Sequence, residues 1–160
     1  MEVSTRVARP DDIDDLVRLY RELEAEQAAL RPLWPFADGL PAPIAGAFAA
    51  LLDDDRSVVR IGTIDGVTLG FVHAAVEPLL PQAEGRTVGV VRLIFTEPAA
   101  RGVGVGTTMV TAAIEDLRTR GVRLFDARVS PGHRHAKNFF EAHGFSARLI
   151  VMHHADDPDG

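Results

Sequence analysis

The chain has 160 residues, 46% of them hydrophobic and 25% charged, which predicts one globular domain with its own core. It contains no cysteine, so disulfides, thiolate nucleophiles and cysteine-ligated zinc are excluded. The net charge of −6 argues against a general nucleic-acid partner. No apolar stretch is long enough to span a bilayer and no signal peptide is visible, so we expect a cytoplasmic protein without a membrane partner.

The charges are unevenly distributed along the chain. Residues 1–100 hold nine arginines and sixteen acidic residues, whereas residues 101–148 hold eight basic and four acidic ones, a net charge of +4. A locally positive region suits an anionic ligand, although most of these charges can equally be solvated helix faces.

The first half of the chain predicts a strand, two helices and a hairpin. Val3–Val7 is β-rich, and Asp11 or Asp12 can cap a helix whose buried face holds Ile13, Leu16, Val17, Tyr20 and Leu23. A proline-rich loop, residues 31–43, precedes a second helix whose apolar side holds Ile44, Phe48, Leu51 and Leu52. Residues 57–76 predict a hairpin around Asp65-Gly66, a dipeptide favoured in two-residue turns.

The second half alternates between strands and helices. We expect a strand at 88–95, a glycine-rich turn, a helix to Arg120, a strand at 122–129, a short helix at 133–143 and a last strand at 145–153. Gly121 and Gly144 are placed to end the two helices. The last residues, 155–160, are expected to be a disordered tail.

The glycine-rich turn, RGVGVGT at 101–107, joins a strand to a helix. This arrangement binds phosphates because the first amides of a helix lack intrahelical partners and lie at the positive end of its dipole. A P-loop would need a lysine after the last glycine, and a dinucleotide fingerprint would need a third glycine at G-x-G-x-x-G spacing. What remains is R-x-x-G-x-G, and the alternative is that the glycines only form a tight turn.

R-x-x-G-x-G after a strand and a proline resembles the acetyl-CoA loop of the GNAT superfamily of N-acetyltransferases. HRHAKNFFEAHGF at 133–145 is similar to the family's second block, with matches at Ala136, Phe139, Gly144 and Phe145. The order β-α-α-β-β-β-α-β-α-β is also the family's. The resemblance implies a single GNAT domain over 1–154 of class α/β (α+β), a mixed sheet of six to seven strands flanked by four helices.

The resemblance also implies acetyl-CoA as co-substrate. The loop amides would receive the pyrophosphate, the Arg101 side chain would add a charge-assisted contact, and the pantetheine arm would pair with the strand end at 93–96. The residues expected to bind the cofactor are Ile94, Phe95, Thr96, Arg101, Gly102, Val103, Gly104, Val105, Gly106, Thr107, His133, Lys137 and Phe140.

Acetyl transfer needs a neutral amine, a donor for the developing oxyanion and, in many relatives, a proton for the departing thiolate. The expected donor is a backbone N–H of Ile94 or Phe95. Candidates for the general base are Glu77 and Asp126, with His73 as a further option, although Asp126 can instead pair with Arg92 or Arg128. The family's proton-donating tyrosine falls on Phe140, which has no proton to give, so Ser130, His133 or water would have to serve.

Trp34 and Phe36 lie in the loop that varies in the family to fit the acceptor, and they can hold an amine or form a lid over the core. The histidines lack the spacing of a zinc site, so no metal is expected. Residues 148–154, RLIVMHH, would form an exposed edge strand, which predicts a homodimer. The leading function is acetyl-CoA-dependent N-acetylation of a primary amine: a small molecule, a peptide N-terminus or a lysine. The alternative is a GNAT-fold acyl-CoA sensor without turnover.

Overall fold

The computed structural model describes residues 1–30, 39–129, 133–154 and 156. Its main elements follow the order β1 (Val3–Val7), α1 (Ile13–Ala29), α2 (Ile44–Leu52), β2 (Ser57–Ile64), β3 (Val67–Pro78), β4 (Thr87–Thr96), α3 (Val105–Thr119), β5 (Phe125–Ala127) and α4 (Arg134–Ala142). Short 3-10 turns precede α1, β4 and α3. The expected mixed α/β architecture is confirmed, and each predicted helix is present within a few residues of its expected bounds.

The five strands form one sheet in the order β1-β2-β3-β4-β5. Neighbours from β1 to β4 are antiparallel, whereas β5 follows the crossover through α3 and runs parallel to β4. The β2–β3 hairpin turns at Asp65 and Gly66, both of which have positive φ. Positive φ at both central residues is what a type I′ turn requires, so the Asp-Gly dipeptide was a reliable signal.

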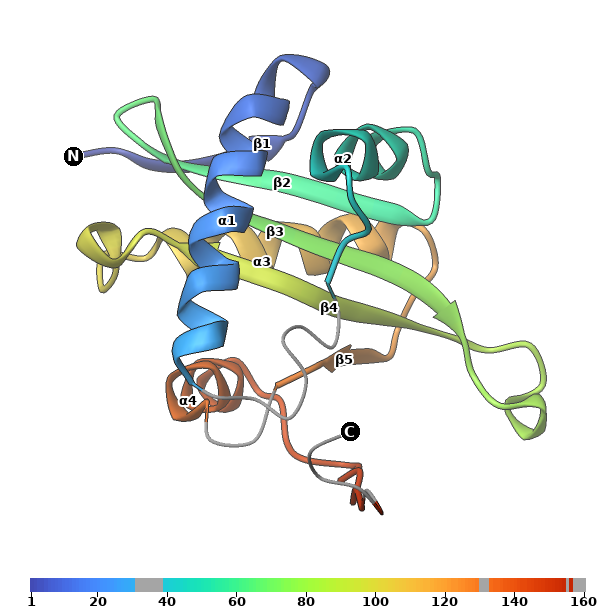
Figure 1. Ribbon diagram of the computed structural model, residues 1–160. Coiled ribbons are helices and arrows are strands. Elements are labelled where there is room, and N and C mark those ends of the chain that lie inside the picture. The colour runs from blue at the N-terminus through green and yellow to red at the C-terminus, as the bar shows by residue number, and fades with distance from the viewer. Residues whose placement is uncertain (31–38, 130–132, 155, 157–160) are drawn as a thin grey trace.

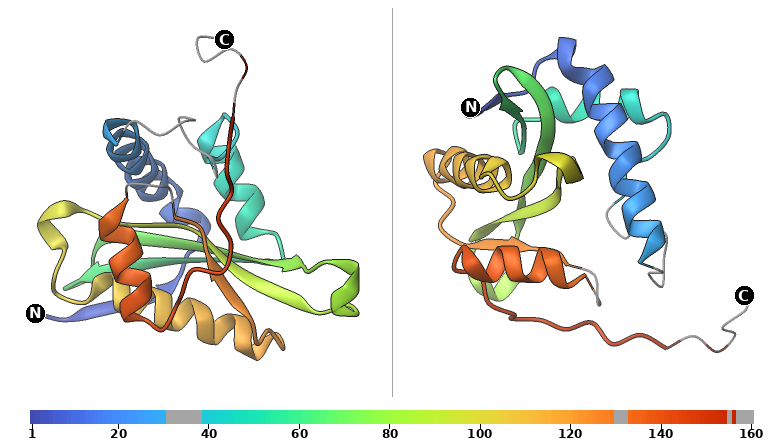
Figure 2. Two further views of the ribbon diagram at one scale, coloured as in Figure 1. Left: turned by 90° about the horizontal axis from the view of Figure 1, so that it is seen from below. Right: turned by 90° about the vertical axis from the view of Figure 1, so that its left-hand side faces the viewer.

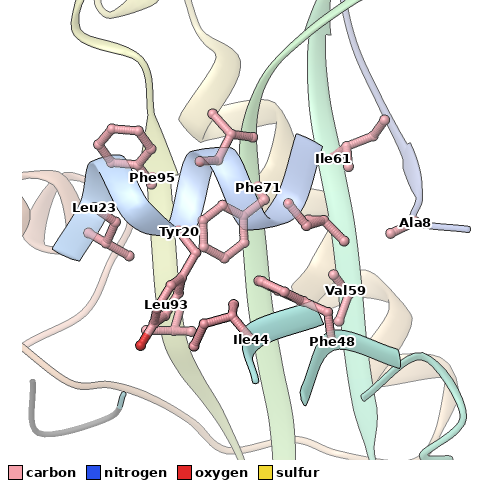
Figure 3. Packing of buried hydrophobic residues seen from close by; sticks show 12 residues of the cluster. Ala8, Tyr20, Leu23, Ile44, Phe48, Val59, Ile61, Phe71, Leu93 and Phe95 are labelled. Carbon is pink, nitrogen blue, oxygen red and sulfur yellow. The ribbon is translucent and has the colours of Figure 1, made fainter. Parts of the chain in front are cut away.

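Helices cover both faces of the sheet (Figures 1 and 2). On one face, α1 and α2 bury a cluster that includes Leu16, Tyr20, Phe48, Phe71 and Phe95 (Figure 3). Phe48 stands at the centre, with edge-to-face ring contacts to Tyr20 and Phe71 at centroid distances of 6.1 and 5.8 Å. The other face packs against α3 and α4 through a second cluster. The apolar faces expected for these helices therefore meet the two sides of one sheet.

Asp12, expected as a possible helix cap, is buried just before α1. Its carboxylate accepts the backbone N–H of Arg9 at 2.8 Å and two N–H groups of Arg6 at 2.7 and 2.8 Å. The hydrogen bonds from Arg6 lower the pKa of Asp12 more than its burial raises it. The residue thus fastens β1 to the start of α1 rather than capping the helix itself.

The expected last strand, 145–153, is not formed, which leaves five strands where six to seven were expected. Residues 146–154 are all exposed, including the apolar run Leu149–Met152. A β-prone sequence becomes a strand only where a ladder partner is available. Here β5 has three residues, and the segment contacts it through the ion pair between Arg148 and Asp126.

Candidate functional site

Strands β4 and β5 separate halfway along β4. They pair at Gly89–Phe125, Val90–Asp126 and Val91–Ala127, and the N–H of Arg128 then donates to the carbonyl of Val91 at 3.3 Å. On the other side of β4, pairing passes from Val91–Ala74 to Leu93–His73, so Arg92 is an extra residue that forms a bulge. Beyond it, no strand in the described part of the chain pairs with the outer edge of residues 93–96. This is the open edge that the resemblance required.

The ladder decides which amides face that open edge. The N–H of Glu97 donates to the carbonyl of Leu69 at 2.8 Å, so Glu97 and Leu69 form a hydrogen-bonded pair. Such pairs alternate along an antiparallel ladder, which turns the N–H of Phe95 toward β3 and that of Ile94 toward the open edge. Of the two expected oxyanion donors, the geometry therefore favours Ile94, and Phe95 is corrected to a core residue whose amide belongs to the sheet.

The loop that follows β4 offers a row of amides. Thr108 is the first residue of the turn whose N–H finds an acceptor, the carbonyl of Gly104 at 2.9 Å. No N–H between 102 and 107 donates to an acceptor among the described residues. These amides lie at the N-terminus of α3, beside the positive end of its dipole. They fit the pyrophosphate of coenzyme A, an anion with several acceptor oxygens.

Each of the three glycines also has a reason within the fold. Gly102 and Gly104 have φ of +85° and +99°, a region that other residues rarely adopt. Gly106 is helical, but a Cβ there would lie 3.2 Å from the ring of Phe139 on α4. The tight-turn alternative thus explains the glycine spacing more fully than expected, and the evidence for a ligand rests on the unpartnered amides.

The Arg101 side chain is anchored in the protein. Its Nε donates to the carbonyl of Thr96 at 2.9 Å, and its Nη2 donates to Glu26 on α1 at 2.6 Å. The guanidinium also lies 5.5 Å from the ring centroid of Phe95. Arg101 therefore ties the end of β4 and the start of the loop to the end of α1, and a direct contact with the pyrophosphate stays a prediction.

Helix α4 packs against the loop through Phe139, whose ring lies beside Gly106, and through His143, which lies 3.1 Å from the Thr107 hydroxyl. His133 precedes the helix and lies 3.2 Å from Gln27 and 4.0 Å from Glu26, and burial lowers its pKa. Lys137 is exposed and pairs with Glu141 at 2.8 Å. The ring of Phe140 is buried against Phe139 and Phe145, inside the second core cluster. The expected contacts of His133, Lys137 and Phe140 with the cofactor stay predictions.

Charged side chains gather on the α1/α2 face of the sheet, where β4 and β5 separate. Phe125, Ala127 and Val129 pack in the cluster on the α3 side, so the alternate residues Asp126 and Arg128 face the opposite side. There Glu77 accepts from Arg92 at 2.7 Å and from Arg128 at 3.2 Å, and Asp126 accepts two N–H groups of Arg148. We call these five residues the charged cluster: Glu77, Arg92, Asp126, Arg128 and Arg148.

The structure therefore brings both predicted bases, Glu77 and Asp126, to one face but pairs each with arginine. The partner of Asp126 is Arg148 rather than the expected Arg92 or Arg128, which both pair with Glu77. His73 is buried in the sheet, 3.4 Å from the hydroxyl of Ser57. Tyr20, the only tyrosine, lies on the buried face of α1, where its hydroxyl accepts the N–H of Leu40 and burial raises its pKa. Trp34, Phe36 and Ser130 lie outside the described residues.

Sequence reasoning missed the roles of four residues, three beside the loop and one in the charged cluster. Glu26 and Gln27 sit at the end of α1, and His143 on α4 lies 3.1 Å from the hydroxyl of Thr107 in the loop. Arg148 was seen only as part of an edge strand. No motif marks any of them, because their roles depend on which elements come together. Among the described residues, no group of three or more acidic or histidine side chains could hold a metal ion, and no helix could cross a membrane.

The comparisons with known proteins agree with this geometry. The model of the acetyltransferase (GNAT) family matches residues 14–145. An uncharacterized N-acetyltransferase of Archaeoglobus fulgidus is 30% identical over 135 residues, which are 84% of this chain and 87% of that protein.

Solved structures share the fold. The aminoglycoside N-acetyltransferase AAC(6')-Iy, in complex with a bisubstrate analogue, has a TM-score of 0.77 at 21% identity, covering 98% of this chain and 99% of its own. A predicted acetyltransferase with acetyl-CoA from Clostridium acetobutylicum has a TM-score of 0.71 at 17% identity, covering 96% of each chain. The chain belongs to the acetyltransferase (GNAT) family and is an acetyl-CoA-dependent N-acetyltransferase by class.

Proposed function

We propose that this chain transfers the acetyl group of acetyl-CoA to a primary amine of a small molecule, a peptide N-terminus or a lysine side chain. One observation carries the proposal. The open edge of β4 at residues 93–96 leads directly into the loop 101–107, whose amides between 102 and 107 have no acceptor among the described residues. An extended pantetheine arm along the edge would place the pyrophosphate on those amides.

In this arrangement backbone N–H groups of the chain bind the cofactor and stabilise the developing oxyanion. Acetyl-CoA supplies the acetyl group as a thioester. The N–H of Ile94 faces the edge along which the thioester would lie, and it can donate to the oxygen that becomes negative as the amine attacks. A fixed backbone donor needs no reorganisation during the reaction, which is why such donors are effective.

Proton transfers are less dependent on the protein. Phe140 cannot protonate the departing thiolate, but a thiol with a pKa near 8.5 can leave without an acid close to neutral pH. Glu77 and Asp126 are the candidate bases, and each is held in ion pairs with arginine, which favour its charged form. Loss of the ammonium proton to water before binding is therefore the simpler route.

Because both carboxylates are held in ion pairs with arginine, a second candidate function is an acyl-CoA sensor without turnover. The two functions differ in one measurement. We expect acetyl-CoA to raise the melting temperature, and free thiol to appear when a panel of primary amines is added. Binding without thiol release over the whole panel would support the sensor, whereas the absence of any thermal shift would overturn the assignment of the loop.

The C-terminal segment supports a further expectation, a homodimer. Leu149, Ile150, Val151 and Met152 are 71–87% exposed, a continuous apolar run that a second copy can cover. Burial of such a run would stabilise a dimer by the hydrophobic effect. Light scattering should give about twice the chain mass of 17.3 kDa at micromolar concentration, and a value near 17.3 kDa would contradict the dimer.

A further inference from the structure

The charged cluster has more positive than negative groups. Three guanidinium groups, those of Arg92, Arg128 and Arg148, meet two carboxylates, those of Glu77 and Asp126. Every oxygen of the two carboxylates accepts an N–H from an arginine: Oε1 and Oε2 of Glu77 from Arg92 and Arg128, and both oxygens of Asp126 from Arg148. Among the described residues, both carboxylates of the cluster are thus engaged by arginine, and the contacts of Arg148 with Asp126 are the ones that matter for a further ligand.

This cluster lies beside the proposed reaction centre. Arg92 is the bulge residue at which β4 leaves β5, and Arg128 directly follows the last paired residues of the two strands. Asp126, which binds Arg148, is opposite Val90, four residues before Ile94, so at about 3.3 Å per residue it lies roughly 13 Å along the strand from the expected oxyanion donor. An acceptor of moderate length can reach both places.

Arg148 has donors to spare. A guanidinium carries five N–H groups, and the two bonds to Asp126 use the Nε and one Nη2 hydrogen. The Arg148 side chain is 61% exposed, and its two hydrogen bonds to the Asp126 carboxylate fix its orientation. An arginine fixed in this way presents a pre-organised fork for a second anion. An ammonium group, in contrast, would meet carboxylates whose charge the arginines already offset, and it would lie close to like charges.

We propose that the amine acceptor carries an anionic group, such as a carboxylate, separated from its amine by several bonds, and that Arg148 binds that group. The inference rests on the proposed acetyltransferase function and names the substrate class of its site. It also distinguishes this chain from an enzyme for polycationic amines, because among the described residues the cluster offers such a substrate no unpaired carboxylate.

The test compares acceptors that differ only in the charge at their far end. ω-Amino acids of four to eight carbons are measured against the corresponding ω-amino amides and terminal diamines, with free thiol as the readout of kcat/KM. We expect the best carboxylate to exceed its amide by about tenfold, the effect expected of one charge-assisted hydrogen bond, and the diamines to be poorest. The preference should shrink as ionic strength rises.

Two variants locate the effect. Arg148→Gln should reduce the preference for the carboxylate to about twofold, whereas Arg118→Gln, which removes an equal charge from the exposed side of α3, should leave it unchanged. A diamine or amide that is the best acceptor, or an unchanged preference in Arg148→Gln, would overturn the inference while the acetyltransferase function stands.

Binding provides a readout that does not depend on turnover. In the presence of coenzyme A, glutarate should raise the melting temperature of the wild-type chain more than 1,5-diaminopentane does, and Arg148→Gln should remove the difference. If no amine is acetylated but this difference is seen, the proposed function fails and the anion site stands. If glutarate has no effect, or acts equally on Arg148→Gln, the anion site is wrong.

Discussion

The loop 101–107, which we propose to bind acetyl-CoA, and the charged cluster lie at the two ends of one open strand edge, and they are built from different parts of the chain. The loop presents backbone amides, held by the start of α3 and by two positive-φ glycines. The charged cluster presents side chains from β3, β4, β5 and the C-terminal segment, and each is oriented by another charged group. A site made of backbone amides tolerates most changes of residue type. The binding properties of a site made of side chains change whenever one of those residues is replaced.

The largest effect is expected from a substitution in the loop 101–107, whose site consists of backbone amides. At Gly104 a side chain meets no atom within 4 Å in the protein, but it would project from a left-handed residue among the amides that we assign to the pyrophosphate. We expect Gly104→Leu to abolish the rise in melting temperature that acetyl-CoA produces. For a ligand at a hundred times its Kd, that rise corresponds to about 2.7 kcal/mol, or roughly 5–10 °C for a chain of this size.

Gly66 provides a matched control for this experiment. It has φ of +81°, also meets no atom within 4 Å, and lies in the β2–β3 turn at a distance in sequence from the loop. Gly66→Leu should lower stability through the same backbone strain and keep the full acetyl-CoA shift. Equal loss of the shift in both variants would mean that strain, rather than obstruction of the amides, explains the result.

This contrast also explains what the sequence could and could not predict. The loop was readable because the glycine spacing and the following helix are local features, and the helices were readable because their apolar faces repeat within a few residues. Even so, the reason for Gly106 was not local: the ring of Phe139, more than thirty residues away, limits that position.

The charged cluster could not be assembled from the sequence. Glu77 and Asp126 were identified as acidic residues on strands, but their partners follow from the β4 bulge at Arg92 and from the path of the C-terminal segment. The missing last strand has a related cause. The sequence 145–153 has the residues of a strand, and a strand's existence depends on a partner edge that no local pattern shows.

Phe140→Tyr tests whether Phe140 on α4 acts only in packing or also affects the transfer of the acetyl group. The Phe140 ring is 4% exposed among Phe139, Phe145 and the α3 core, so an added hydroxyl would be buried. We expect the free energy of unfolding to fall by about 1–3 kcal/mol, measured by urea denaturation, because a buried hydroxyl without a partner is costly. The rate of transfer should be unchanged or raised.

An active enzyme in which Phe140→Tyr stops transfer but retains acetyl-CoA binding would contradict this expectation. That outcome would show that the phenylalanine ring itself shapes the thioester pocket. Phe145→Leu, a substitution of a neighbouring ring in the same cluster, serves as the control for packing alone.

The ion pair between Glu26 and Arg101 holds the loop 101–107 against the end of α1, so here side chains support a site made of backbone amides. We expect Glu26→Gln and Arg101→Gln each to weaken acetyl-CoA binding about three- to tenfold, measured by calorimetry, because either change releases the loop from α1. The double variant should bind acetyl-CoA no more weakly than Arg101→Gln alone, since the pair with Glu26 is already lost in that variant. If Arg101 instead binds the pyrophosphate directly, Arg101→Gln would be clearly more harmful, and Glu26→Gln would tighten binding by freeing the guanidinium.

The smallest expected effect concerns His133, which lies against Glu26 and Gln27 at the junction of α1 and α4. Burial lowers its pKa below the ordinary value of 6.5, so the unfolded chain takes up a proton at a higher pH than the folded chain does. The neutral histidine therefore contributes stability that is fully present above pH 6.5 and is lost as the pH falls toward the folded pKa. We expect the melting temperature of His133→Gln to fall less between pH 6.5 and 5 than that of the wild type. His154→Gln, at an exposed position of the C-terminal segment, should keep the wild-type decline. An equal decline in all three proteins would show that His133 does not sense pH at this junction.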